Sequence, residues 1–223
     1  MSGPTVRELP LEFTPYIYKT GKTIKLPGVE VAQEAVDFLT VLKERRSVKQ
    51  LGKCTLEKLS QILYYGVKPY CIGKDDYGMT VYRSAAPSAG GRHPIDILVG
   101  LKEWDGRHLY LYLPLNHSLK RLNVEKELVA AFFDDVEHTL PMGESVLLWF
   151  SVQVMRTASK YTDFMSLVWR DLGAQLCCLQ QVAKYVGTDS CPIGYLAEDT
   201  FNALFQTELL VSGGGMIIGD KKK

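Results

Sequence analysis

Four short segments of the chain carry residue types that could bind a ligand or move a proton. The first is ERRSVKQ, in which Arg45, Ser47 and Lys49 alternate along the sequence. In an extended segment these three side chains point to one side, and two cations beside a hydroxyl group suit a phosphate. Taken alone, the segment fits a solvated basic helix end better than a phosphate site.

The second segment is YRSAAPSAGGRHP, which is almost free of reactive side chains and leads directly into the strand-like run IDILVGL. Its centre consists of Pro87, Ser88, Ala89 and Gly90, and such small residues leave backbone N–H and C=O groups accessible to a flat ligand. The alternative is a tight connection into a strand. The sequence assigns no role to the Arg-His pair that ends the segment.

The third and fourth segments are SKYTDF and SCPIGYLAED. Lys160 and Tyr161 precede a long helical pattern, and a lysine and a tyrosine beside a pocket can act as a proton-transfer pair. They also fit an ordinary polar helix start. CPIG is expected to form a turn that brings a backbone N–H to a ligand, whereas Cys191 has no recognisable partner for a nucleophilic role.

Composition excludes several classes of function. The chain has 223 residues and a net charge of +1, so no global charge favours nucleic acid or a membrane surface. The longest uncharged apolar run, 145–155, is too short to span a bilayer. Five cysteines without a CxxC pair, and four histidines without a ligand pattern, predict no metal site. We expect a cytoplasmic protein.

The pattern of apolar residues divides the chain into an extended N-terminal arm, 1–30, and a single domain, 31–223. Asp105-Gly106 between two apolar runs predicts a hairpin. The run 145–155 predicts a central strand buried on both faces, and 68–84 reads as a surface loop. Helices are expected at 32–47, 54–67, 119–135, 161–187 and 197–205. Because strands and helices do not alternate regularly, the fold class is α+β.

The order of these motifs resembles the FMN-dependent nitroreductase superfamily. RRSxK, PSAGGRHP and CPIGY follow one another, and YRSAAPSAGGRHPIDILV, SKY and WRDLGAQL resemble its branch of SagB-type and McbC-type dehydrogenases. The resemblance covers roughly residues 42–219. It implies a nitroreductase-like fold, with a mixed, mainly antiparallel central sheet surrounded by helices, and an intertwined homodimer that binds FMN.

The resemblance also implies roles for individual residues. Arg45, Ser47 and Lys49, with Arg46 as a helper, would hold the ribityl phosphate. The backbone of residues 87–90 would lie along the isoalloxazine ring, often across a homodimer interface. Gly194 would place a backbone donor near flavin N5. The catalytic pair would be Lys160 and Tyr161.

Members of that branch oxidise thiazolines and oxazolines in ribosomally made precursor peptides to thiazoles and oxazoles, alongside a partner cyclodehydratase. Two alternatives stay open: a general NAD(P)H-dependent nitro- or quinone reductase of the same fold, and a flavin-free scaffold subunit of a peptide-modifying complex. One departure concerns the tail. The family commonly places a basic residue near the C-terminus on the phosphate, and the sequence GDKKK does not show which lysine would reach it.

Overall fold

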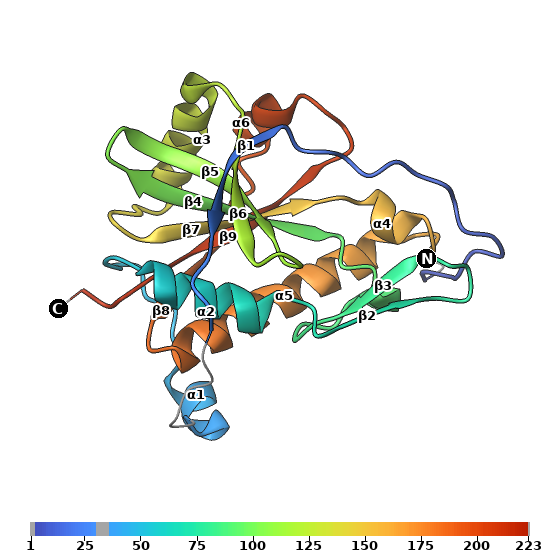
Figure 1. The fold of residues 1–223 in the computed structure, drawn as a ribbon, viewed down its shortest axis with the longest axis horizontal. Helices are drawn as coiled ribbons and strands as arrows, with labels where there is room; N and C mark the ends of the chain where they lie inside the picture. The colour runs from blue at the N-terminus through green and yellow to red at the C-terminus, as the bar shows by residue number, and fades with distance from the viewer. Residues whose placement is uncertain (1–2, 30–35, 223) are drawn as a thin grey trace.

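The computed structural model describes residues 3–29 and 36–222 and has an α+β fold built on one seven-stranded sheet (Figure 1). The strand order is β1-β6-β5-β4-β7-β9-β8, and every neighbouring pair is antiparallel. These strands are β1 (Thr20–Lys25), β4 (Ile95–Glu103), β5 (Gly106–Leu113), β6 (Ser118–Leu122), β7 (Val146–Val152), β8 (Asp189–Ile193) and β9 (Val211–Gly219).

Helices cover both faces of this sheet. On one face α2 (Leu56–Gly66) packs against the long helix α5 (Met165–Tyr185), and on the other α3 (Lys126–Thr139) packs against α6 (Glu198–Phe205). Two short helices lie outside these layers, α1 (Phe38–Glu44) and α4 (Met155–Ala158). The chain ends lie on opposite sides of the molecule (Figure 1).

The central strand β7 has the burial that its sequence predicts. All seven of its residues are buried. Trp149 packs with Phe132 and Phe201 in the core beneath α3 and α6, whereas Phe150 packs with Leu179 in the core beneath α2 and α5. A strand that buries both faces needs apolar residues at every position, which is why VLLWFSV shows almost no alternation.

Helix α2 also follows its sequence signals. The Thr55 side chain accepts a hydrogen bond from the Lys58 N–H, as an N-cap residue does. Leu59, Ile62 and Leu63 form the buried face against the sheet. The helix ends at Gly66, where the sequence predicts its end.

The segment 68–84, predicted to be a surface loop, is instead a β-hairpin of β2 (Cys71–Lys74) and β3 (Thr80–Arg83). The prediction was wrong because the turn was not recognised. Asp75 Oδ1 accepts hydrogen bonds from the Tyr77 and Met79 N–H groups, and Gly78 supplies a positive φ of 74°. The two strands are largely exposed, so hydrophobic alternation gave no signal.

Several predicted boundaries also need correction. The helix predicted over 119–135 begins only at Lys126, because Ser118–Leu122 forms β6 between β1 and β5. The helix predicted over 32–47 spans Phe38–Glu44 in the structure, and the part of it at 32–35 lies outside the described residues. Its predicted apolar face is exposed at Leu39 and Leu42.

Near the C-terminus, the CPIG segment is not a turn, because its first three residues belong to strand β8. The segment around the three consecutive glycines is the continuous strand β9 rather than two short runs. The long helix begins at Met165, four residues after the predicted start. Within the predicted N-terminal arm, β1 pairs with β6 at the edge of the sheet, which ties that part of the chain to the domain.

Candidate functional site

The small-residue segment forms a tight loop between β3 and β4. Residues Ala89–Gly91 make one short helical turn, in which Gly90 and Gly91 have φ values of 60° and 66°. A Cβ atom on Gly91 would lie 3.1 Å from Val81 Cβ and 3.2 Å from the Tyr82 carbonyl oxygen. Both the backbone conformation and the available space therefore require glycine at this position.

Asp171 on α5 holds this loop in place. Its carboxylate accepts a 2.6 Å hydrogen bond from Ser88 Oγ and a 3.0 Å bond from the Ala89 N–H. Ser88 Oγ in turn accepts from the His93 N–H at 2.8 Å. The sequence marked the WRDLGAQL segment but gave Asp171 no role, because its partners lie more than eighty residues away along the chain.

Burial raises the pKa of Asp171 above its usual 3.8, although the hydrogen bonds from Ser88 and Ala89 oppose the rise. The folded protein therefore keeps this proton to a higher pH than the unfolded chain does. The contribution of Asp171 to stability falls as the pH rises from 3.8 through the folded-state pKa.

The two residues that end the loop segment, unassigned from the sequence, both support the loop. Arg92 is buried, and its guanidinium group lies 2.6 Å from the Asp75 carboxylate. The His93 ring lies within hydrogen-bonding distance of the Tyr82 carbonyl oxygen, at 3.0 Å. Burial lowers the pKa of His93, which favours the neutral ring at that carbonyl.

Lys160 and Tyr161 lie directly against this loop, so the structure brings two of the predicted motifs together. A Cβ atom on Gly90 would lie 2.7 Å from Tyr161 Oη and 3.2 Å from Lys160 Cδ. Both residues follow the short helix α4 and precede α5. The loop, which is separated from them by about seventy residues in sequence, meets them through the tertiary fold alone.

The N-terminal arm fixes the backbone of the Lys160–Tyr161 segment. The Arg7 N–H donates to the Lys160 carbonyl at 2.9 Å, and the Thr162 N–H donates to the Thr5 carbonyl at 2.9 Å. Val6 and Tyr161 form an antiparallel bridge. Figure 1 shows the arm running from β1 around the side of the molecule on which α4 lies. The arm therefore acts as an added strand along this segment.

Two of the remaining predicted residues, Lys49 and Gly194, line a different cavity. A cavity of about 800 Å³ is lined by Lys49, Gly194, Cys191 and Lys222, among others. No side chain or backbone atom fills the space beside Gly194, since a Cβ there would meet nothing within 4 Å. Two lysines and an accessible backbone suit an anionic ligand. Lys222 is one of the three tail lysines between which the sequence does not choose.

The other residues of the basic segment are placed differently. Ser47 pairs with Ser190 of β8 in a parallel bridge, and the Val48 N–H donates to the Ser190 carbonyl at 2.9 Å, which fixes the segment beside β8. Arg45 is half-buried at the end of α1. Arg46 turns back and donates to the Lys43 and Arg45 carbonyls, so its guanidinium group caps α1. Of these residues only Lys49 lines the 800 Å³ cavity.

The thiol of Cys191 lies in that cavity wall without signs of activation. Burial raises the pKa of Cys191, and the nearby positive charge of Lys49 offsets only part of the rise. A thiol with a raised pKa is a poor nucleophile near neutral pH. This agrees with the absence of a nucleophilic partner in the sequence.

Within the described residues the predicted site therefore falls into two groups. A second cavity, of about 560 Å³, is lined by Asp75 and by Pro87, Ser88 and Gly90 of the loop. It shares no lining residue with the 800 Å³ cavity. One chain thus carries a basic half-site at Lys49 and Gly194 and a loop half-site at 87–90 with Lys160 and Tyr161.

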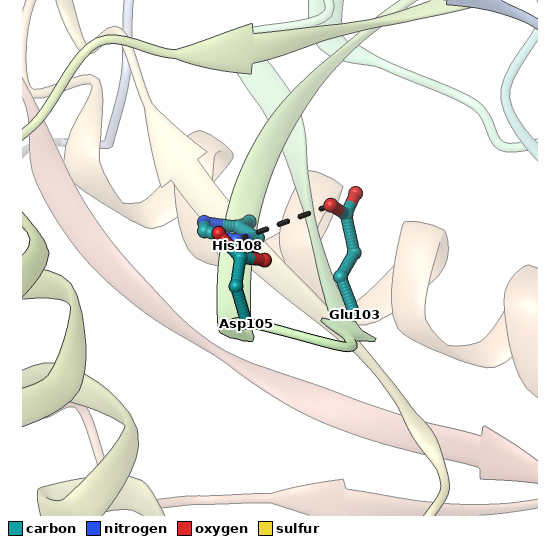
Figure 2. Close-up of side chains that lie close together, drawn as sticks. All are labelled: Glu103, Asp105 and His108. Atoms are coloured by element: carbon teal, nitrogen blue, oxygen red, sulfur yellow. Dashed lines mark hydrogen bonds and ion pairs between the residues drawn. The ribbon is translucent and has the colours of Figure 1, made fainter.

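A third group of side chains, outside both half-sites, has the composition of a metal centre. Figure 2 shows Glu103, Asp105 and His108, the β4–β5 cluster, at the hairpin that joins those strands. Arg121 Nη2 lies 2.7 Å from His108 Nδ1, and Lys126 Nζ lies 3.6 Å from Asp105 Oδ2. These two cations balance the two carboxylates, so the cluster has no net negative charge to attract a divalent ion.

We compared the chain with known proteins by sequence and by structure. No known protein-family profile matches it, and no curated protein matches it in sequence. Solved structures do match. A protein described as a nitroreductase from Ralstonia eutropha JMP134 superposes with a TM-score of 0.66 and 16% identity, over 96% of this chain and 98% of that one.

Two further structures broaden the comparison. A chain of the Escherichia coli microcin synthetase McbBCD complex, with truncated pro-MccB17 bound, matches with a TM-score of 0.61 and 14% identity, over 98% of this chain and 85% of that one. A Staphylococcus epidermidis protein described as an NAD(P)H:FMN oxidoreductase has a TM-score of 0.56 and 14% identity, over 88% and 92% of the two chains. The chain has the nitroreductase-like fold, as its sequence predicts. In the described part of the chain no helix is both long and apolar enough to cross a bilayer.

Proposed function

We propose that this chain, which has the nitroreductase-like fold, is an FMN-dependent dehydrogenase that aromatises thiazoline and oxazoline rings in a ribosomally made precursor peptide. It would act in the cytoplasm, in a complex with a cyclodehydratase. The observation that carries the proposal is the contact of Lys160 and Tyr161 with the loop at Gly90. The likeness to a chain of the McbBCD microcin synthetase supports it.

The residues present fit FMN on physical grounds. Lys49 and Lys222 supply positive charge at the 800 Å³ cavity, where the 5′-phosphate would be held with help from Arg45 and Ser47. Gly194 leaves its backbone uncovered at the same cavity. The loop at 87–90 carries only small side chains, which lets a flat ligand approach it closely, and Asp171 holds it in place. Arg46, engaged with the end of α1, would contribute only through the local positive field.

The separation of the two half-sites supports a homodimer. The two cavities share no lining residue in a single chain, and in the proposed dimer one FMN would take the basic half-site of one chain and the loop half-site of a second copy. The exposed apolar residues Phe38, Leu39 and Leu42 of α1 offer surface that such a pairing would cover. The domain division remains part of this proposal: an extended arm, 1–30, on a single FMN-binding domain, 31–223.

The proposed chemistry is a net loss of one hydride and one proton from an azoline ring. FMN, when bound, would supply the hydride acceptor. Lys160 or Tyr161 would take the carbon-bound proton, and the arm would keep their backbone fixed while it does so. The Gly90 backbone, in contact with both side chains, would set how far they reach toward the ring.

Substitution of the catalytic pair tests this proposal. Lys160→Ala and Tyr161→Phe should each lower azole formation on a cyclodehydratase-treated peptide by about a hundredfold or more, the usual share of a general acid or base. Both variants should still hold FMN. Lys53→Ala, an exposed lysine outside both cavities, is the control. Azole formation that survives both substitutions would remove the assigned role.

A second function stays open because nitroreductase-like and NAD(P)H:FMN oxidoreductase-like structures share the fold. A general NAD(P)H-dependent nitro- or quinone reductase would show rapid flavin reduction by NAD(P)H without any peptide. Anaerobic mixing followed at the flavin absorbance band separates the two functions. A purified protein that never binds FMN would instead favour a scaffold subunit.

A further inference from the structure

Asp75 joins three parts of the loop half-site through its two carboxylate oxygens. Oδ1 accepts from the Tyr77 and Met79 N–H groups, at 3.0 and 2.9 Å, and so closes the β2–β3 turn. Oδ2 lies 2.6 Å from Arg92 Nη2 and 3.7 Å from Lys160 Nζ. One oxygen thus shapes the hairpin, and the other faces two cations.

Burial makes this arrangement more than a surface ion pair. The side chains of Arg92, Asp75 and Lys160 are 3%, 11% and 18% exposed. Arg92 Nε has no hydrogen-bond partner among the described residues, so Asp75 is the main compensation that the structure offers for this buried charge. Protonation of Asp75 would leave the Arg92 guanidinium group buried without a counter-ion, and such a buried unpaired charge strongly destabilises a folded protein. The folded protein therefore favours the ionised form of Asp75.

Asp75 is a carboxylate that the structure holds beside the Lys160 side chain, with Oδ2 3.7 Å from Nζ. The Tyr161 ring lies on one side, with its centroid 6.0 Å from Lys160 Nζ. The N-terminal arm contributes Arg7, whose Nε donates to the Ala158 carbonyl. Arg92 and Lys160 are linked through Asp75, because both approach the same carboxylate oxygen, Oδ2. Burial raises the pKa of Asp75, but its N–H donors, Arg92 and Lys160 together lower it below its usual range.

We propose that Asp75 is a positioning residue, which holds the Lys160 amine against the loop at Gly90, with Arg92 as the buried cation that holds Asp75. The proposal gives a role to the hairpin that the sequence reads as a plain loop: its turn carries the carboxylate into the half-site. The catalytic meaning of this contact rests on the proposed function of Lys160, whereas the contact itself does not.

Asparagine at position 75 separates the turn from the ion contact. Asp75→Asn keeps a carbonyl oxygen for the Tyr77 and Met79 N–H groups but removes the negative charge near Lys160. Asp76→Asn changes a neighbouring exposed carboxylate of the same turn and is the matched control. Asp75→Glu retains the charge, with one more methylene group, and tests rescue.

The reactivity of Lys160 toward acetic anhydride, read by mass spectrometry relative to the other lysines, reports the contact without any enzyme assay. Near neutral pH, Asp75→Asn should raise Lys160 acetylation about three- to tenfold, since the loss of a partly buried contact worth roughly 1 kcal/mol lets the Lys160 amine leave the loop half-site for solvent. Asp76→Asn should leave it unchanged, and Asp75→Glu should stay close to wild type. Unchanged acetylation of Lys160 in folded Asp75→Asn would overturn the proposal.

Circular dichroism would check that each variant folds. If Asp75→Asn fails to fold because Arg92 is left unpaired, the double variant Asp75→Asn/Arg92→Met, which removes both buried charges, is used instead. Its Lys160 acetylation should lie between the wild-type level and the level expected for Asp75→Asn. No rise in that variant would also overturn the proposal. If acetylation changes as expected but the wild-type protein forms no azole, the proposed function fails and the role of Asp75 in holding Lys160 stands.

Discussion

Replacement of Gly90 by alanine tests the contact on which the proposed site depends. Gly90 has a φ of 60°, a conformation that costs an L-residue about 1–2 kcal/mol. For a domain of this size, that loss lowers the melting temperature by roughly 2–8 °C. The new Cβ would also lie 2.7 Å from Tyr161 Oη and 3.2 Å from Lys160 Cδ, so both side chains would have to move.

Gly187→Ala provides the matched control. Gly187 has a φ of 74°, and a Cβ atom there would meet nothing within 4 Å. Alanine at position 187 should therefore lower the stability through the backbone by about as much as alanine at position 90, without touching the site. By differential scanning calorimetry Gly90→Ala should melt at or below the temperature of Gly187→Ala, because only Gly90→Ala adds close contacts with Tyr161 and Lys160.

Azole formation, measured by mass spectrometry on a cyclodehydratase-treated peptide, should separate the two variants. Gly90→Ala should lose at least about tenfold in kcat, because a displacement of about 1 Å in a catalytic group commonly costs that much or more. Gly187→Ala should retain wild-type kcat. Equal kcat values for the two variants, measured at a temperature where both are folded, would refute the idea that Lys160 and Tyr161 act where they touch the loop.

The remaining predictions concern the rest of the site. In thermal melts from acid to neutral pH, the stability advantage of wild type over Asp171→Asn should shrink as the pH rises above 3.8, and a growing advantage would contradict the sign of its pKa shift. Lys49→Gln and Lys222→Gln should each weaken FMN binding about fivefold in fluorescence titrations, the effect of roughly 1 kcal/mol, whereas Lys53→Gln should not. Mn²⁺ or Zn²⁺ should not raise the melting temperature through the β4–β5 cluster, and a rise that Asp105→Asn abolishes would show that the cluster binds metal.

The sequence predicts the elements whose signals are local. Thr55 and the apolar face of α2 fall within one segment, and the unbroken apolar run of β7 reports its burial directly. The β2–β3 hairpin was missed because its strands are exposed and its turn depends on the side chain of Asp75. The sequence of β6 was predicted to be helical because its apolar residues also fit helical spacing. Its pairing with β1 and β5 makes it a strand in the fold.

In the candidate site, too, the features with a local sequence signal were predicted and those that depend on distant segments were not. Individual motifs were recognisable in the sequence, and the tertiary structure brings Lys160 and Tyr161 to the loop at Gly90. Asp171 and Asp75 carry no local signature, since their partners come from distant segments. The sequence gives no reason to prefer one of the three adjacent tail lysines, whereas the structure shows that Lys222 lines the 800 Å³ cavity with Lys49.

Anaerobic mixing of the FMN-loaded protein with an azoline-containing peptide tests the central claim most directly. The account predicts bleaching of the flavin absorbance band without NAD(P)H, together with loss of two hydrogen masses per azole formed in the peptide. Bleaching by NAD(P)H alone, with the azoline peptide unchanged, would contradict it and identify the chain as a general reductase.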